Sequence, residues 1–529
     1  MRAWPDTSGK LAAGLGEAAA MAMPYAALPD HRLPRTALGI LLALALARLL
    51  LHLLTNGQYG FHRDELAVLD DAHHLAWGYV AYPPLVPFLA HASMQLFGDS
   101  LDAYRTPSAL AQALAMLFAG LIARELGGRR FAQVVAAIAV ACVPFSMLAG
   151  SMLQYTSPDY LWWVLAAWLL LKLANGGDPR WWLCLGLVIG LGTMTRYTML
   201  FCVAGIVVAA LATPLRRQLA GPWPWAGAVL SLLVFAPNAW WQWQHDFVYL
   251  DFVQHIHARD VEIGRTGDFL SGQLLLGAGP LLVPLWLAGL AWLAFAKGAV
   301  RWRLLAWLYA AALGLFWLAG ARDYYLAPAY PMLLAAGAVV LERGIARLRP
   351  RTVLVARSAT ALVLLAALMA SALVALPLAP VGSQGWHVSR RFHDNFAEQV
   401  GWPELVAQVA TIYHALPEAE RARTAIYANN YGEAGAIDRY GPALGLPAAI
   451  SGINSYWARG YGNPPPTTVI VLGDDAEGIS DTPATCTLAG RVRIPHGVEN
   501  EESGHSDIYV CRDLKFDWAK AWPGMRSFG

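Results

Sequence analysis

The chain is poor in charged residues. Only 14% of its 529 residues are Asp, Glu, Lys or Arg, while 57% are hydrophobic; a soluble domain carries about 25% charged residues. The mean hydropathy of +0.42 agrees with this bias. The net charge of +2 gives no case for nucleic-acid binding. The composition therefore predicts a membrane protein, whose 22 Trp and 20 Tyr would line two membrane–water interfaces.

Cysteine is also scarce, with five in the chain. Three of them, Cys142, Cys184 and Cys202, lie in apolar runs, where side-chain packing is their expected role. Cys486 and Cys511 are the pair in the polar C-terminal tail. In an oxidising compartment they would be placed to form a disulfide, and two free thiols is the alternative of equal weight.

The N-terminal stretch lacks the order of basic, apolar and small-residue regions that marks a cleaved secretion signal. We therefore expect residues 1–35 to form a disordered extension. Residues 36–55 are then the first membrane span and not a removed signal.

Apolar runs recur along residues 36–378. A helix needs about 20 residues to cross a bilayer, and we predict about eleven spans, several of them short: residues 36–55, 104–123, 131–149, 159–174, 181–194, 197–213, 225–241, 270–296, 302–319, 324–341 and 358–376. With the N-terminus in the cytoplasm, Lys and Arg fall on inner loops almost throughout, as the positive-inside rule requires. The first outer loop is then residues 56–103, and an odd number of spans places the tail outside the cytoplasm.

The tail, residues 379–529, is predicted to be a soluble α/β domain. Strand-like runs cover residues 424–428, 467–472, 490–494 and 508–511, and residues 433–440 are helix-like. In the first outer loop, residues 63–77 and 85–97 are predicted to lie as helices at the membrane interface. The fold class is therefore mainly α, a polytopic helical bundle followed by a small α/β domain.

Two adjacent carboxylates, Asp64 and Glu65, follow the first span in the motif Phe-His-Arg-Asp-Glu. Transfer of a sugar to a hydroxyl or amine needs a base that takes the acceptor's proton, and one carboxylate near the acceptor meets that need. The alternative, to which the spacing alone gives more weight, is capping of a helix, since acidic residues favour its first turn.

Asp159 and Arg196 are predicted on the same outer side as Asp64. Asp159 opens a predicted span, where capping and function are equally weighted. Arg196 stands between two short apolar runs in a Thr-Arg-Tyr element, where an arginine needs a partner such as a lipid phosphate. Snorkelling of its side chain to the interface is the alternative.

Aromatic and basic residues form two further motifs on that side. Tyr82 precedes a Pro-Pro pair, an element that suits a cleft wall. Arg322 is followed by Tyr324 and Tyr325, and its guanidinium would clamp a phosphate through two hydrogen bonds. The tyrosines would contact the sugar or belong to the interfacial belt.

A metal site has weak support. His255, His257 and Asp260 cluster in the predicted outer loop 242–269, but their spacing matches no strong ligand pattern. The sequence therefore predicts no certain cofactor, with a divalent metal as a poorly supported option.

In their order and sidedness, these motifs resemble the GT-C superfamily, specifically glycosyltransferase family 39 of the PMT_2 type, which is related to protein O-mannosyltransferases and to the aminoarabinose transferase of lipid A. The resemblance rests on Arg63-Asp64-Glu65, on Tyr82 with its Pro-Pro, on Thr195-Arg196-Tyr197 and on residues 322–331. The tail stretches 429–435 and 451–457 resemble one bacterial subgroup. Where the aminoarabinose transferases carry Lys, this chain has Tyr82, which puts the phosphate contacts there in doubt.

The resemblance implies a GT-C bundle in the cytoplasmic (inner) membrane and a polyprenyl-phosphate sugar donor. It also implies an acceptor outside the cytoplasm, which is a lipid, glycan or protein, and inversion at the anomeric carbon. Asp64 would be the base, with Glu65 and Asp159 as the other catalytic candidates. The substrate-binding candidates would be Arg63, Tyr82, Arg196, Arg322, Tyr324 and Tyr325.

Two other classes of protein remain open from the sequence. A transporter or flippase would place ionisable groups near mid-membrane and often shows inverted repeats, whereas here the acidic groups lie at one surface and no repeat is visible. A membrane scaffold would use the tail to bind other envelope proteins. Covalent sugar transfer separates the enzyme from both.

Overall fold

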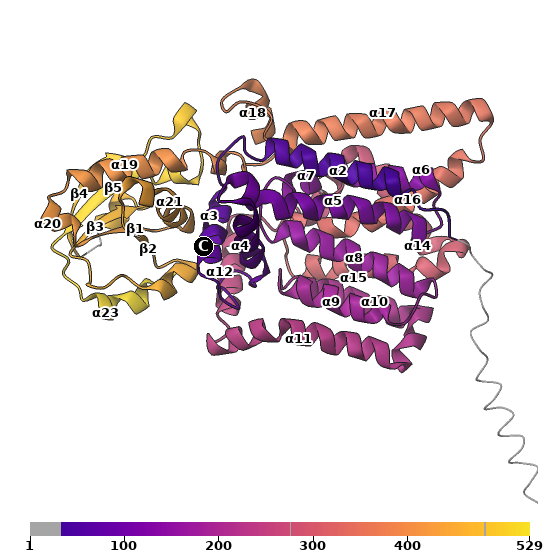
Figure 1. Ribbon diagram of the computed structural model, residues 1–529, viewed down its shortest axis with the longest axis horizontal. Helices are drawn as coiled ribbons and strands as arrows, with labels where there is room; N and C mark the ends of the chain where they lie inside the picture. Colours follow the sequence, from indigo (N-terminus) through magenta and orange to yellow (C-terminus); the bar gives the residue numbers. More distant parts are fainter. Residues whose placement is uncertain (1–32, 276, 481–482) are drawn as a thin grey trace, which may run out of the picture.

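The computed structural model describes residues 33–275, 277–480 and 483–529. The predicted disordered extension, residues 1–35, lies almost wholly outside the described residues. Figure 1 shows an elongated molecule with a helical bundle at one end and a small sheet domain at the other. The helices α3 (Arg63–His73), α4 (Leu85–Phe97) and α12 (Val248–Glu262) lie where the two parts meet.

The bundle contains most of the apolar helices of the chain. They are α2 (Leu38–Thr55), α5 (Leu101–Glu125), α6 (Arg130–Ala141), α7 (Pro144–Ala149), α8 (Thr156–Ala174), α9 (Trp181–Thr193), α10 (Met199–Ala212), α11 (Pro222–Gln244), α13 (Phe269–Leu275), α14 (Val283–Phe295), α15 (Leu304–Leu318), α16 (Tyr330–Ile345) and α17 (Pro350–Ala375). Small residues allow them to pack closely: Gly186 of α9 faces the backbone of Gly227 in α11, with no room for a side chain. Such contacts are typical of helices that associate in a bilayer.

Only some of these helices are long enough to span a membrane by themselves. Among the described residues, four segments pass by length and composition, namely Leu38–Thr55, Leu101–Glu125, Asp323–Ile345 and Pro350–Ala375, and the bent pair Met199–Ala212 with Pro214–Ala220 would be a fifth. The mainly helical class is confirmed, but the predicted count of about eleven spans is not. Several of the predicted spans are helices such as α6, α9 and α15, which are shorter than the ~20 residues that cross the hydrocarbon core.

The C-terminal part forms a mixed five-stranded sheet. Its strands are β1 (Thr424–Ala428), β2 (Ala449–Ile450), β3 (Thr468–Leu472), β4 (Thr485–Arg491) and β5 (Asp507–Arg512). Their order is β2-β1-β3-β5-β4, with β2, β1 and β3 parallel, and β5 antiparallel to both of its neighbours. The helices of this part are α18 (Gln384–Arg390), α19 (Trp402–Ala415), α20 (Glu418–Arg421), α21 (Tyr431–Tyr440), α22 (Ala476–Ser480) and α23 (Trp518–Ala521).

Three of the four predicted strands are confirmed, and the fourth is displaced. The run predicted at residues 490–494 overlaps only the end of β4, because β4 is an edge strand that is largely exposed and lacks a continuous apolar run. The two-residue β2 is too short to give a sequence pattern.

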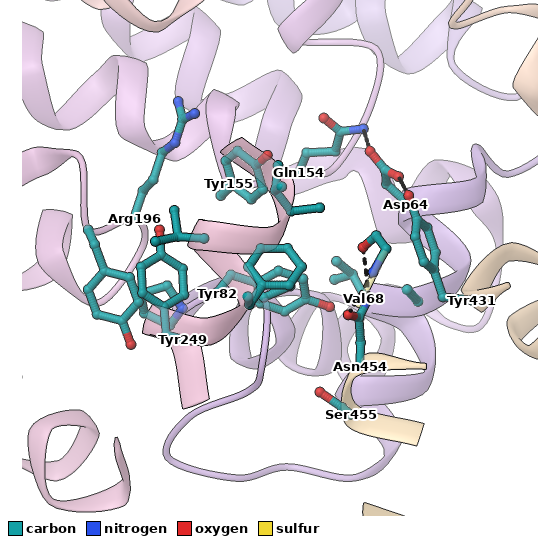
Figure 2. Close-up of a pocket in the computed structure, with 18 of the residues that line it drawn as sticks. Asp64, Val68, Tyr82, Gln154, Tyr155, Arg196, Tyr249, Tyr431, Asn454 and Ser455 are labelled. Atoms are coloured by element: carbon teal, nitrogen blue, oxygen red, sulfur yellow. Dashed lines mark hydrogen bonds between the residues drawn. The ribbon is translucent and has the colours of Figure 1, made fainter. Parts of the chain in front are cut away.

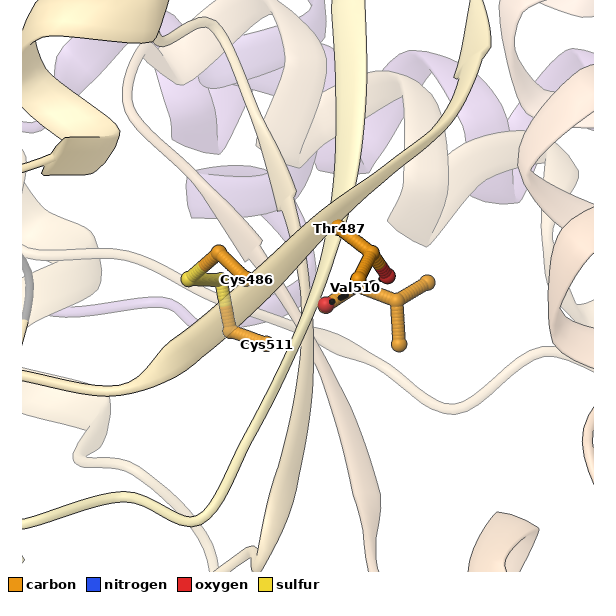
Figure 3. Close-up of a disulfide and its surroundings, with 4 residues drawn as sticks. All are labelled: Cys486, Thr487, Val510 and Cys511. Atoms are coloured by element: carbon orange, nitrogen blue, oxygen red, sulfur yellow. Dashed lines mark hydrogen bonds between the residues drawn. A yellow bond between two sulfur atoms is a disulfide. The ribbon is translucent and has the colours of Figure 1, made fainter.

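Cys486 and Cys511 form a disulfide across opposite positions of β4 and β5 (Figure 3). Beside it, the Thr487 hydroxyl donates a hydrogen bond to the Val510 carbonyl at 3.3 Å. Of the two alternatives that the sequence left open, a disulfide or two free thiols, the structure shows the disulfide.

One hydrophobic cluster runs through both parts of the molecule. It includes Leu66 and Leu69 of α3 together with Val406 and Val409 of α19 and Ile437 of α21, all buried. Because these side chains share one core, the sheet domain is packed against the first outer loop and not merely tethered to the bundle.

Candidate functional site

A cavity of about 210 Å³ lies at the junction of the two parts. Several predicted site residues line it together: Asp64, Tyr82, Arg196, Arg322 and Tyr325. Figure 2 shows Asp64 and Arg196 on opposite sides of this cavity, with Tyr82 and Tyr155 between them in that view. Segments that are far apart in the sequence therefore meet at one point.

Asp64 is held on both of its carboxylate oxygens. Gln154 Nε2 donates to Oδ2 at 3.0 Å, and the Tyr431 hydroxyl donates to Oδ1 at 2.8 Å. Burial raises the pKa of Asp64, but His62, Arg63 and the bond from Tyr431 outweigh it and lower the pKa below its ordinary value. The side chain is therefore an anion at neutral pH, with its remaining lone pairs free to accept a proton.

Glu65, the other carboxylate of the motif, does not line the cavity. It is fully buried and ion-paired with Arg105 of α5, whose Nε lies 3.0 Å from Oε1. It also accepts from the backbone N–H groups of His62 and Leu153, at 2.9 and 2.7 Å. Glu65 therefore caps α3 and fixes the segment that carries Gln154, so the capping alternative describes it better than a catalytic role.

Arg63, which precedes Asp64 in the chain, does not line the cavity. It forms an ion pair with Glu501, and its guanidinium lies 4.6 Å from the ring centre of Tyr431. The residue predicted to bind substrate thus contacts the C-terminal domain.

Arg196 is buried in an aromatic cage. Its guanidinium lies 3.9 Å from the ring centre of Tyr325 and 4.7 Å from that of Tyr155. Asp159, in the first turn of α8, is its nearest carboxylate at 3.9 Å and lines neither this cavity nor the larger one beside it. The arginine has rings on several sides but only a loose ion pair, which leaves it able to take an anion.

Arg322 is engaged more tightly. Its Nε and Nη2 donate to the two carboxylate oxygens of Asp260 at 2.6 and 2.8 Å. Asp260 belongs to the loop 242–269, where the sequence supports a metal site only weakly. Among the residues that the structure describes, no group of three His, Cys, Asp or Glu side chains is arranged to hold a metal ion.

Tyr82 and Tyr324 have different surroundings. The Tyr82 hydroxyl donates to Asp71 at 2.7 Å and faces the cavity. Tyr324 instead lines a second, largely apolar cavity of about 1000 Å³ among residues of α7, α13 and α17. The two cavities share Asp64, Gln154, Tyr155 and Arg322, so the polar site adjoins a space that suits a hydrocarbon chain.

Sequence reasoning gave no site role to Arg259 of α12. It lines the polar cavity, and its Nε is buried without a hydrogen-bond partner among the described residues. Burial lowers its pKa more than the nearby Asp260 raises it. An amphipathic outer helix with one arginine facing inward gives little signal in a single sequence. Tyr431 lay in a stretch singled out only for its resemblance.

Comparisons with known proteins give a family match over part of the chain. Residues 81–241 match the PMT_2 family, described as dolichyl-phosphate-mannose-protein mannosyltransferase. The lipid A galacturonosyltransferase RgtD of Rhizobium johnstonii is 25% identical over 255 residues, which are 47% of this chain and 52% of that protein. The chain thus spans about half the length of this curated relative.

Solved structures share the fold over most of the chain. The crystal structure of ArnT from Cupriavidus metallidurans in the apo state has a TM-score of 0.56 at 14% identity and covers 89% of this chain and 97% of ArnT. The same protein bound to undecaprenyl phosphate gives 0.55 at 15% identity, with the same coverage. The mycobacterial arabinofuranosyltransferase AftD gives 0.52 at 18% identity, over 92% of this chain and 40% of AftD. The family match and this shared fold confirm the resemblance of this chain to GT-C glycosyltransferases of the PMT_2 type.

Proposed function

We propose that the chain is an integral membrane glycosyltransferase that moves a sugar from a polyprenyl-phosphate donor to an acceptor outside the cytoplasm. The observation that carries this proposal is one polar cavity that holds the Asp64 carboxylate and three arginines and adjoins a large apolar cavity. A relative named for lipid A and a fold neighbour bound to undecaprenyl phosphate favour a lipid acceptor and a prenyl donor.

Asp64 acts as the base. It takes the proton from the acceptor's hydroxyl or amine as that atom attacks the anomeric carbon, and the bond from this carbon to the phosphate oxygen breaks with inversion. The departing polyprenyl phosphate is already an anion and needs no protonation. The hydrogen bonds from Gln154 and Tyr431 keep the carboxylate aimed at the cavity.

The arginines bind the donor phosphate. Arg196 supplies a guanidinium at the aromatic end of the cavity, and Arg259 supplies one whose Nε has no hydrogen-bond partner among the described residues. Arg322 contributes less, because its Nε and Nη2 already donate to Asp260. Preorganised cations of this kind stabilise charge that develops on the leaving group, while the apolar cavity accommodates the prenyl chain.

The same arrangement suits an orientation with the sheet domain outside the cytoplasm. A disulfide persists in an oxidising compartment, and the sheet domain carries one between Cys486 and Cys511. We propose the cytoplasmic membrane as the location, with the N-terminus inside.

Arg259→Gln tests the donor site. Its unpaired guanidinium should bond to the phosphate, and a hydrogen bond to a charged group contributes about 1.5–3 kcal/mol. The affinity of the purified protein for sugar-free polyprenyl phosphate, measured by titration calorimetry in detergent, should therefore fall about 10- to 100-fold.

Arg265→Gln is the matched control, because Arg265 is exposed just beyond the end of α12 and lines neither cavity. It should bind the lipid as the unaltered protein does. Equal affinities of the Arg259 and Arg265 variants would remove Arg259 from the donor site.

A further inference from the structure

The C-terminal domain contacts the proposed catalytic base through Tyr431. On the basis of the proposed function, with Asp64 as base, we propose that Tyr431 is a positioning residue that orients the Asp64 carboxylate, so that the C-terminal domain completes the active site. The family match covers residues 81–241 and does not extend to this domain.

The geometry assigns each carboxylate oxygen of Asp64 to a different part of the chain. Gln154, from the bundle, bonds Oδ2, and Tyr431, at the start of α21, bonds Oδ1. Without the tyrosine hydroxyl, the bond from Gln154 alone would hold the carboxylate, which could then turn more freely about its side-chain bonds. A base that must meet an acceptor within about 3 Å loses efficiency when it is not held in place.

Tyr431 is itself held rigidly. Asn430 caps α21 by accepting from the backbone N–H of Glu433 at 2.9 Å, and it donates to Glu502 at 2.8 Å. On the face of the Tyr431 ring lies the Arg63 guanidinium, at 4.6 Å from the ring centre. Neighbours of Asp64 in the sequence and the C-terminal domain therefore both fix this ring.

Two glycines set the distance between α21 and α3. A Cβ on Gly435 would lie 2.8 Å from the backbone oxygen of Leu66, and one on Gly432 would lie 3.0 Å from the Cβ of Arg63. Larger side chains at either position would push α21 away from α3 and move the Tyr431 hydroxyl out of reach of Asp64. The stretch 429–435 thus places Tyr431 by both capping and close packing.

The hydrogen bond also acts on the charge of Asp64. The charged and titratable groups that face Asp64 are His62, Arg63, Tyr104, Tyr155, Arg322, Glu398 and Tyr431. Burial raises the pKa of Asp64. The combined effect of His62, Arg63, Tyr431 and Arg322 lowers it by more, so the pKa lies below its ordinary value. Because Asp64 works as the carboxylate, activity is present above its pKa and is lost as the pH falls through it.

Tyr431→Phe removes the hydroxyl and keeps the ring. With a polyprenyl-phosphate sugar as donor, we expect kcat to fall about 10- to 100-fold, with the donor KM unchanged within about twofold, because the arginines are untouched. The acid limb of the pH–rate profile should move to higher pH, since one group that lowers the pKa of Asp64 is gone. A purely structural role of Tyr431 would not move that limb.

Tyr440→Phe is the matched control, at the other end of the same helix and outside both cavities. It should keep the kcat and the acid limb of the unaltered protein. If Tyr431→Phe does the same while Asp64→Asn is inactive, the positioning role is overturned although the base remains. If Asp64→Asn is fully active, the proposed role of Asp64 as base fails, and the positioning role of Tyr431 fails with it.

A second measurement serves if the phenylalanine variant does not fold. Incorporating 3,5-difluorotyrosine at position 431 keeps the ring and hydroxyl and makes the hydroxyl a stronger donor. It should move the acid limb to lower pH, the direction opposite to that of phenylalanine. An unchanged limb would contradict the proposal.

Discussion

Asparagine in place of Asp64 should lower kcat for sugar transfer by about 1000-fold, within the range that general bases contribute. The amide keeps the size of the side chain, and its oxygen still accepts one hydrogen bond from Gln154 or Tyr431. It cannot take a proton from the acceptor at neutral pH. Donor binding should be almost unchanged, because the arginines and the apolar cavity remain. The measurement is transfer from a polyprenyl-phosphate sugar by the purified, folded variant.

Two further variants sharpen this test. Asp102→Asn changes an exposed aspartate at the start of α5 that lines neither cavity, and it should transfer at the unaltered rate. Asp64→Glu keeps the charge one methylene further out and should retain partial activity. Near-normal transfer by Asp64→Asn would remove Asp64 from the mechanism.

Glutamine in place of Arg196 should raise the KM for the donor by about 100-fold and lower kcat as well. Its guanidinium fills a cage of tyrosine rings, closest to Tyr325 at 3.9 Å, and within the described part of the chain its one ion-pair partner is Asp159, at 3.9 Å. In the proposed function, the phosphate of the donor becomes its principal counter-charge when the lipid binds. Losing the guanidinium would leave the leaving group without this stabilisation. Steady-state kinetics with varied donor concentration measure both constants.

Arg196→Lys separates charge from shape. An ammonium carries the charge but lacks the planar guanidinium that stacks on aromatic rings, so this variant should fall between glutamine and the unaltered protein. Arg180→Gln, on an exposed arginine just before α9, is the control and should leave both constants unchanged. Equal donor KM values for Arg196→Gln and Arg180→Gln would contradict a phosphate role.

The sequence allowed much of this site to be predicted because the sidedness of the loops is encoded in charge. Once Lys and Arg were assigned to inner loops, Asp64, Tyr82, Arg196 and Arg322 fell on the same outer side, and the structure does bring them to one cavity. The amphipathic run after the first span predicted α3, and an apolar run too short to span the membrane predicted α4.

Other parts were beyond a single sequence for identifiable reasons. Glu65 and Asp64 are neighbours, and only the fold shows that the helical turn sends one to Arg105 and the other to the cavity. The pairing of Arg322 with Asp260 joins residues 62 positions apart. Tyr431 meets Asp64 across 367 positions, through a docking of domains that no local periodicity reports. The span count stays a prediction, because several helices of the bundle are apolar but shorter than a full span.

The most direct test of this account is a cryo-EM structure of the protein with polyprenyl phosphate bound. We expect the phosphate beside Arg196 and Arg259 in the cavity that contains Asp64, with the prenyl chain in the adjoining apolar cavity. A lipid whose phosphate lies away from these arginines, on the far side of the bundle from Asp64, would contradict it.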